Sequence, residues 1–262
     1  MKNIVLLAGL TALMMSSCEV KEKVSSSNGE PFGMNIACAD FGSVFPGEYN
    51  KDYTYPTDSD LVYWEKKGLK LVRMPFKWER LQYKLDGGLN KHDLEKMKEF
   101  VVAAQKRGIK VLLDLHNYCR RFENGDHRII GTYGITNQNY AGFWKKIASE
   151  FKDYDNIYGY GLMNEPHDLP DSISWFKMAQ LAIDSIRMVD TKNTIVVGGN
   201  SWSSAKRWLT ESDTLKFLKD PAENLMFEAH CYFDKDGSGT YKYSYEEEEG
   251  TPEKGRQLVA PF

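Results

Sequence analysis

Ionisable side chains stand where apolar runs of the sequence end, and two of them could do chemistry. Glu165 closes the run in residues 161–166, GLMNEP, where its carboxyl group could donate and accept a proton beside the amide of Asn164. Arg73 is a cation within residues 71–76, LVRMPF, where burial is costly unless a carboxylate pairs with it. Taken alone, Asn164 and Glu165 fit the start of an ordinary loop equally well.

Histidines accompany two further apolar runs. His116 ends the run LDLH, and His230 lies in the segment AHCY. Because alternate residues of a strand point to one face, His230 and Tyr232 would point together and Cys231 away from them. Either histidine alone fits a hydrogen-bonded core residue, but polar residues at several successive run ends favour one shared site.

The elements that must position these residues alternate between apolar strands and amphipathic helices. Strands are predicted at residues 33–37, 70–76, 110–116, 157–163, 194–199 and 225–232. Helices are predicted at 58–67, 91–107, 138–154 and 171–189, with a short helical stretch at 214–219 and a helix start at 251–253. Strands separated by helices in this order form a parallel sheet that the helices cover.

The residues at the strand ends separate two kinds of parallel sheet. A nucleotide-binding sheet would carry G-x-x-x-x-G-K-[ST], or G-x-G-x-x-G after its first strand, and the sequence has neither. Polar residues end almost every strand instead, which is typical of the (β/α)8 TIM barrel, an α/β fold. Since about six of eight βα units are predicted in residues 31–262, we expect an incomplete barrel whose open edges promote aggregation.

The first 18 residues are typical of an export signal. Lys2 precedes an apolar run at 4–15, and small residues follow directly before Cys18. This pattern resembles the bacterial lipoprotein signal, with Cys18 as the lipidated residue and residues 19–30 as a polar tether. We expect a protein anchored by lipid in the bacterial cell envelope; a plain signal peptide and secretion are the alternative.

Composition excludes some partners. The 262 residues carry a formal net charge of −3 without a basic segment, which argues against nucleic acid. The 15 Tyr and 6 Trp fit either a tyrosine-rich surface or a cleft that stacks sugar rings. No C-x-x-C pair and no His-x-His in the first strand occur, so we expect no metal and no cofactor. The remaining histidines are expected to face solvent: His92, His127 and His167.

Taken together, the residues at the strand ends resemble those of glycoside hydrolase family 5, the retaining cellulases and mannanases. The segments GMNIACADFG (33–42), MPFKWERL (74–81), NEPHD (164–168) and FDKDGSGT (233–240) are similar to its endo-1,4-β-glucanase branch. The resemblance implies a monomer that hydrolyses β-glucan by acid/base and nucleophile double displacement. The alternatives are a β-1,4-mannanase of the same family and a non-catalytic surface lipoprotein that captures glycans.

The resemblance also implies a role for each matching residue. These roles are Glu165 as general acid and then base, Asn164 as the ligand of the substrate 2-hydroxyl, Arg73 as electrostatic support of the nucleophile, His116 as a substrate ligand, and His230 with Tyr232 as residues that orient the catalytic carboxylates. Further substrate-binding candidates are Trp202, as a stacking platform, with Asn200 and Asn35. Ordinary packing is the alternative for Trp202.

The sequence departs from the family pattern at the nucleophile. That residue is a Glu at the end of the seventh strand, and we expect it to lie beyond Phe262. Neither Glu228, which lies deeper in its strand, nor the run 246–249 is expected to replace it. We therefore predict no detectable cellulase activity for the 262-residue product, and activity for a chain extended through two further strands.

A second departure concerns cysteine. Cys38 and Cys119 stand where this branch usually has Gly, and both follow strands at the same face of the barrel. In an exported protein we expect a disulfide between them.

Overall fold

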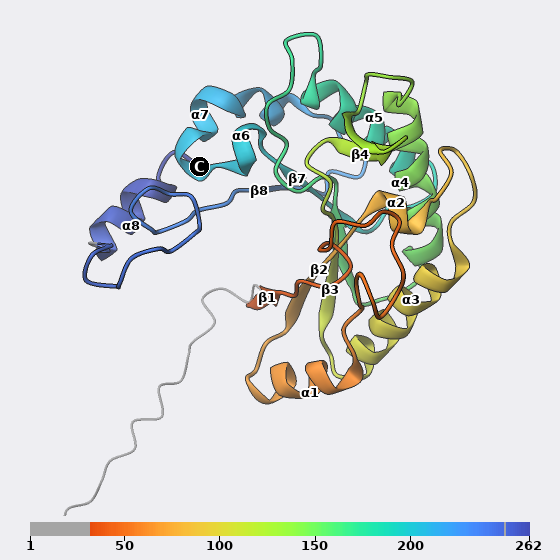
Figure 1. Ribbon diagram of the computed structural model, residues 1–262, viewed down its shortest axis with the longest axis horizontal. Coiled ribbons are helices and arrows are strands. Elements are labelled where there is room, and N and C mark those ends of the chain that lie inside the picture. Colours follow the sequence, from red (N-terminus) through yellow and green to blue (C-terminus); the bar gives the residue numbers. More distant parts are fainter. Residues whose placement is uncertain (1–31, 249) are drawn as a thin grey trace, which may run out of the picture. The chain divides into compact units, whose positions relative to one another are not determined.

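The computed structural model describes residues 32–248 and 250–262 (Figure 1). The predicted signal peptide, its lipidated Cys18 and the tether at 19–30 lie outside these described residues. Within the described part of the chain, no helix is long and apolar enough to cross a membrane.

A parallel sheet of six strands is the centre of the described fold, in the order β1-β2-β3-β6-β7-β8. Each strand pairs with the next one of this sheet along the chain, which is the order of a barrel wall. The strands are β1 (Gly33–Asn35), β2 (Leu71–Phe76), β3 (Lys110–Leu115), β6 (Ile157–Gly161), β7 (Thr194–Gly198) and β8 (Leu225–Glu228).

Several predicted strands run past the observed ones at their carboxyl ends. The predicted 157–163 corresponds to β6, which ends at Gly161, and the predicted 225–232 corresponds to β8, which ends at Glu228. The backbone turns away there: Glu165 has a φ of 47°, and His230 keeps only an isolated bridge to Ser204. The polar residues after the strands therefore leave the ladder to form the mouth of the sheet.

The longer helices form as predicted, and all of them except the last, at residues 252–259, lie along the outside of the sheet (Figure 1). Their amino ends are capped by Ser, Thr or Asn side chains, four of which accept a hydrogen bond from a backbone N–H of the first turn. These helices are α1 (Asp58–Lys66), α3 (Lys91–Lys106), α4 (Asn137–Phe151), α5 (Trp175–Arg187) and α8 (Pro252–Val259).

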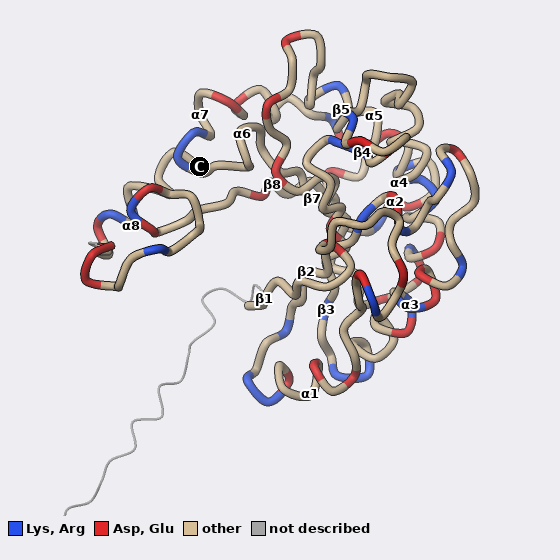
Figure 2. The backbone as a smooth tube through the Cα atoms, viewed as in Figure 1, with Lys and Arg blue, Asp and Glu red and all other residues tan. Residues whose placement is uncertain are grey.

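Short elements after the strands were not predicted, except for the helical stretch near 214–219. They are α2 (Trp78–Leu81), β4 (Arg120–Glu123), β5 (Asp126–Ile129), α6 (Asn200–Ser203), η2 (Ala205–Arg207), α7 (Trp208–Glu211) and η3 (Asp213–Phe217). The antiparallel β4–β5 hairpin had a signal, because Asn124 and Gly125 form its two-residue turn with positive φ at both. Lys, Arg, Asp and Glu are interspersed over helices and loops (Figure 2).

Buried aromatic side chains tie the core to the strand ends. The Tyr140 hydroxyl and the Trp144 indole both donate to the carbonyl oxygen of Leu162, at 2.7 and 3.0 Å. The Trp175 indole donates to the carbonyl oxygen of Gly198 at 2.8 Å. Because these donors are fully or almost fully buried, the segments that leave β6 and β7 are held by the packed core.

Candidate active site

Side chains from strands β1, β2, β3 and β8 and from the segments after β3, β6 and β8 meet at the carboxyl end of the sheet. His230 follows β8, and its ring lies between two carboxylates: Nδ1 is 2.6 Å from Oε1 of Glu165, and Nε2 is 2.6 Å from Oε1 of Glu228. A neutral imidazole has one N–H, so only the imidazolium donates to both carboxylates. Burial alone lowers the pKa of His230, but the hydrogen bonds to Glu165 and Glu228 outweigh it and raise the pKa to about 9.

Arg73 joins this group from β2. Its Nη2 donates to Oδ1 of Asn164 at 2.7 Å and lies 3.0 Å from both Oε1 of Glu228 and Oδ1 of Asp114. Nη1 donates to Oδ1 of Asn35 at 2.8 Å. Burial opposes the charged guanidinium, yet the carboxylates of Asp114 and Glu228 leave the pKa of Arg73 raised.

Glu228 is the carboxylate that Arg73 and His230 share. Its side chain is 17% exposed, and burial by itself disfavours the charged form. The hydrogen bond from His230 and the charge of Arg73 overcome this and lower the pKa of Glu228 to about 2. Glu228 is therefore ionised at neutral pH and has no proton to give.

His116 is connected to the same group through Asp114. Nδ1 of His116 lies 2.8 Å from Oδ2 of Asp114, whose other oxygen contacts Arg73. With Nδ1 as the donor, Nε2 is the acceptor of a neutral ring. The predicted residues Arg73, His116, Asn164, Glu165 and His230 thus lie in one continuous network of hydrogen bonds and ion pairs.

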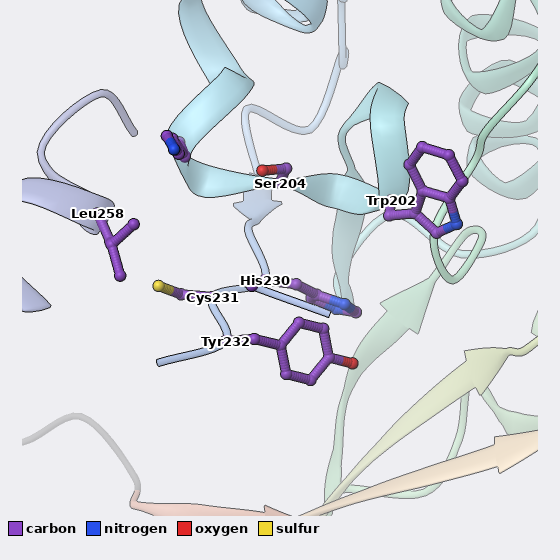
Figure 3. A pocket seen from close by; sticks show the side chains of 8 residues that line it. Trp202, Ser204, His230, Cys231, Tyr232 and Leu258 are labelled. Carbon is purple, nitrogen blue, oxygen red and sulfur yellow. The ribbon is translucent and has the colours of Figure 1, made fainter. Parts of the chain in front are cut away.

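Tyr232 and Cys231 lie as the strand alternation predicted. In Figure 3 the side chains of His230 and Tyr232 extend to one side, and the sulfur of Cys231 extends to the other, toward Leu258. Burial and the nearby carboxylate of Glu165 raise the pKa of Tyr232, which keeps its hydroxyl protonated beside Glu165. The ring remains 42% exposed, so it borders the open part of the site.

Trp202 is held in an exposed position by an unusual backbone. Ser201, Trp202 and Ser203 all have positive φ, between 51° and 59°, a conformation that costs roughly 1–3 kcal/mol for a residue other than Gly. The backbone N–H of Trp202 donates to the carbonyl oxygen of Pro166 at 3.1 Å. His167 stacks on the indole with a centroid distance of 4.6 Å and an interplanar angle of 11°. The indole is thereby fixed while 41% of the residue stays exposed.

The two candidate asparagines outside the network's centre are tied to protein groups. Asn200 donates through Nδ2 to the carbonyl oxygen of Glu211 at 2.9 Å, and it lines an open cleft of about 560 Å³ together with Trp202 and His167. Asn35 accepts from Arg73, as described above. Asn200 therefore lies at the cleft beside Trp202, and Asn35 lies at the charged network.

The predicted disulfide is wrong for this structure. Cys38 and Cys119 are both free and buried, and Sγ of Cys38 donates to the carbonyl oxygen of Pro75 at 3.2 Å. Burial raises the pKa of both thiols, which keeps them protonated. The Cys38 thiol points to strand β2 and not to Cys119. Cys119 has a φ of 57°, so its backbone is not in the extended conformation that the prediction assumed.

Sequence reasoning missed three residues of the site. Asp114 had a signal, because it is a carboxylate inside an apolar strand, where only a cation would stabilise it. Glu228 was considered only as a nucleophile. His167 was expected to face solvent, and this was wrong, since it packs against Trp202; His92 and His127 are exposed as expected.

The charge on His230 predicts a dependence of stability on pH. A folded-state pKa of about 9, against 6.5 for the ordinary group, stabilises the fold fully below about pH 6.5. This stabilisation is lost as the pH rises to about 9 and amounts to roughly 3 kcal/mol at 1.36 kcal/mol per unit.

Urea denaturation of the chain and of a His230→Gln variant at pH 6 and pH 9.5 measures this contribution of His230 to stability. We expect the difference in free energy of unfolding between the two proteins to shrink by about 2–3 kcal/mol at the higher pH. Tyr and Cys groups of the unfolded chain also begin to titrate in this range, but their effect is the same in both proteins and cancels in the difference. An equal difference at both pH values would show that His230 is not charged in the folded state.

Comparison with known proteins places this site in a family. The model of the cellulase family, glycosyl hydrolase family 5, matches residues 25–260. Among curated relatives, the manganese dependent endoglucanase Eg5A of Phanerodontia chrysosporium is 33% identical over 80% of this chain and 54% of that relative. Endo-beta-1,4-glucanase B of Aspergillus niger is 33% identical over 83% of this chain and 63% of that relative.

A solved structure agrees with the sequence comparison. The endoglucanase Cel5A of Pseudomonas stutzeri in complex with cellobiose is 37% identical, with a TM-score of 0.81 over 88% of this chain and 68% of that one. The chain thus spans between about half and two thirds of the length of the two curated relatives. Among the described residues, no group of three or more His, Cys, Asp or Glu is placed to hold a metal ion. The chain belongs to glycoside hydrolase family 5, and the six parallel strands of its described part are strands of that family's (β/α)8 barrel.

Proposed function

We propose that the whole protein is a retaining endo-β-1,4-glucanase that cleaves β-glucan by double displacement. The observation that carries this proposal is the carboxyl group of Glu165, bound by His230 at the carboxyl end of the sheet beside an exposed indole. In this mechanism Glu165 protonates the glycosidic oxygen and later takes a proton from water.

Asn164 supports the binding of a sugar hydroxyl. Its Oδ1 accepts from Arg73, which fixes the orientation of the amide. The Nδ2 group is then the donor that remains for a substrate oxygen, and a hydrogen bond to the 2-hydroxyl stabilises the transition state of glycoside hydrolysis.

Double displacement also needs a nucleophilic carboxylate about 5–5.5 Å from the acid. Glu228 shares His230 with Glu165, but its Oε1 is occupied by both Arg73 and His230. We therefore assign Glu228 no nucleophilic role. The proposal concerns the whole protein, because the chain spans only 54–63% of the curated relatives described above.

Substrate class follows from the relatives and the cleft. The relatives named above are endoglucanases, and one solved structure holds cellobiose. Two alternatives are tested with it: a β-1,4-mannanase, whose substrate differs at the 2-hydroxyl, and a glycan-capturing protein without catalysis.

The test is hydrolysis of cellohexaose and mannohexaose by the whole protein, followed by NMR of the first anomer formed. Cleavage of internal bonds of cellohexaose with the β-anomer appearing first is the expected result. The α-anomer appearing first would contradict double displacement. Faster cleavage of mannohexaose would identify a mannanase, and binding of either sugar without cleavage would favour the glycan-capturing protein.

Trp202 supplies a separate prediction on substrate binding. His167 covers one face of its indole, so a sugar ring would stack on the other face. Trp202→Ala is expected to raise KM for cellohexaose by about 2- to 10-fold, corresponding to about 0.5–1.5 kcal/mol of stacking, with little change in kcat. Tyr63→Ala on α1, which removes an exposed ring from an outer helix, is the control. An unchanged KM in Trp202→Ala would refute the stacking role.

We also propose that the protein is a monomer anchored by lipid at Cys18 in a bacterial cell envelope, or secreted. The basic residue, apolar run and small residues before Cys18 support this placement. Cys18→Ala is expected to abolish incorporation of labelled palmitate and release the protein from the membrane fraction. Equal labelling of the variant and the unchanged protein would overturn the anchor.

A further inference from the structure

We infer that Glu228 is a positioning residue, which keeps the His230 ring doubly protonated and so fixes the carboxyl group of Glu165. The catalytic part of this inference rests on the proposed function. The contacts that carry it lie within the described residues and involve side chains from β2, β3 and β8 and from the segments that follow β6 and β8.

The first step is the placement of the His230 ring. Glu228 is the last residue of β8, and His230 follows two positions later, so both side chains lie on one face of the extended chain. Nε2 of His230 is 2.6 Å from Oε1 of Glu228, and Nδ1 is 2.6 Å from Oε1 of Glu165. When both carboxyl groups are ionised, a neutral ring would direct the lone pair of one nitrogen at a carboxylate, which only the doubly protonated ring avoids.

The second step is that His230 is held by contacts other than the one to Glu165. The backbone N–H of His230 donates to the carbonyl oxygen of Ser203 at 2.7 Å, and its carbonyl oxygen accepts from Ala205 at 2.9 Å. Glu228 adds the contact at Nε2 that fixes the rotation of the ring. On the other side of the ring, the backbone of Glu165 lies in the left-handed region with a φ of 47°, and its Oε1 meets Nδ1 of His230.

The third step is the balance of charge around the ring. The guanidinium of Arg73, from β2, lies 3.0 Å from Glu228, and its positive charge opposes that of the His230 ring. Asp114, from β3, is the second carboxylate that contacts this guanidinium, also at 3.0 Å. Glu165 and Tyr232 complete the titratable groups that face His230 from the segments after β6 and β8. Removing the charge of Glu228 leaves Arg73 acting against the imidazolium with one carboxylate fewer to stabilise it.

The consequence for chemistry is an assignment of the two oxygens of Glu165. Because His230 occupies Oε1, the proton that reaches the glycosidic oxygen is carried by the other oxygen. Glu228 touches no reacting atom in this arrangement and acts through His230.

The test is a pH titration of the His230 ring nitrogens by ¹⁵N NMR in the 262-residue chain. In the unchanged protein both nitrogens are expected to carry protons at pH 7.5, with a titration midpoint near 9. Glu228→Gln is expected to lower this midpoint by at least about one unit, a tenfold change in proton affinity. Glu95→Gln, at an exposed position of α3, is the matched control and is expected to leave it unchanged.

A midpoint in Glu228→Gln that equals that of the control would overturn the inference. If Glu228→Gln fails to fold, Glu228→Asp is the second variant, because it keeps the negative charge but moves it away from the ring by one methylene. A titration midpoint between that of the unchanged protein and that expected for a neutral residue 228 would support the inference. A midpoint equal to that of the unchanged protein would overturn it.

Activity of the whole protein separates this inference from the proposed function. Glu228→Gln is expected to lower kcat on cellohexaose about tenfold at pH 7 and to change KM by no more than about twofold. In the profile of kcat against pH, the alkaline limb is expected to move to lower pH by about one pH unit. Hydrolysis with an unchanged profile would refute the positioning role and keep the proposed function. A shifted midpoint without any hydrolysis of glycans would support the effect of Glu228 on the ring and contradict the proposed function.

Discussion

Glu165→Gln in the whole protein is expected to lower kcat on cellohexaose by about 10²- to 10⁴-fold. Gln keeps the shape of the side chain and can still accept a hydrogen bond from His230, but it has no proton to give to the leaving oxygen. The loss should appear mainly in kcat, because the acid acts in the transition state more than in binding.

The leaving group decides whether this loss reflects general acid catalysis. A dinitrophenyl cellobioside has a leaving group that needs no protonation, so formation of the glycosyl-enzyme should be slowed far less than with cellohexaose. Glu95→Gln is the control for loss of a carboxylate and is expected to behave like the unchanged enzyme. Equal losses on both substrates would contradict the role of Glu165 as the acid.

Arg73→Met is expected to cost about 3–5 kcal/mol in free energy of unfolding, because it removes the cation from the buried carboxylate of Asp114 and leaves the carboxylate of Glu228 with His230 alone. The side chain of Asp114 is 1% exposed, and that of Glu228 is 17% exposed. The low pKa of Glu228 gives stability that is present above about pH 4.5 and lost as the pH falls toward 2. The cost of Arg73→Met should therefore shrink at acidic pH, as measured by urea denaturation.

Arg187→Met is the matched control for this variant. Arg187, the last residue of α5, and Asp220, which precedes β8, form an ion pair that is at least as buried, with side chains 3% and 2% exposed. This pair lies at the end of the sheet opposite the site, because Asp220 precedes its strand. We expect a similar loss of stability in both variants, but a fall of about 10²-fold in kcat only for Arg73→Met. Equal kcat values in the two variants would exclude a role for Arg73 in the reaction.

Much of the framework could be predicted because it depends on local patterns. Apolar strands and capped helices alternate through the chain, and parallel strands deliver their carboxyl ends to one rim. Arg73, Asn164, Glu165 and His230 therefore meet at this rim, although up to 157 positions separate them, from 73 to 230. The alternation of side chains along a strand also correctly separated Cys231 from its neighbours.

The remainder depends on contacts that a linear pattern does not contain. The link between Glu228 and His230 requires the ring to turn between two segments, and the stack of His167 on Trp202 requires three successive residues with positive φ. The Cys38 thiol binds a backbone carbonyl, a partner that similarity to Gly positions could not reveal. These features arise where tertiary packing overrides local preference.

A crystal structure of the whole protein with Glu165→Gln and bound cellohexaose tests the central claim most directly. The account predicts a glycosidic oxygen within about 3 Å of the side chain at residue 165, with the His230 ring still bound to that side chain and to Glu228. A sugar chain bound away from residue 165, or a His230 ring that contacts neither carboxyl position, would contradict it.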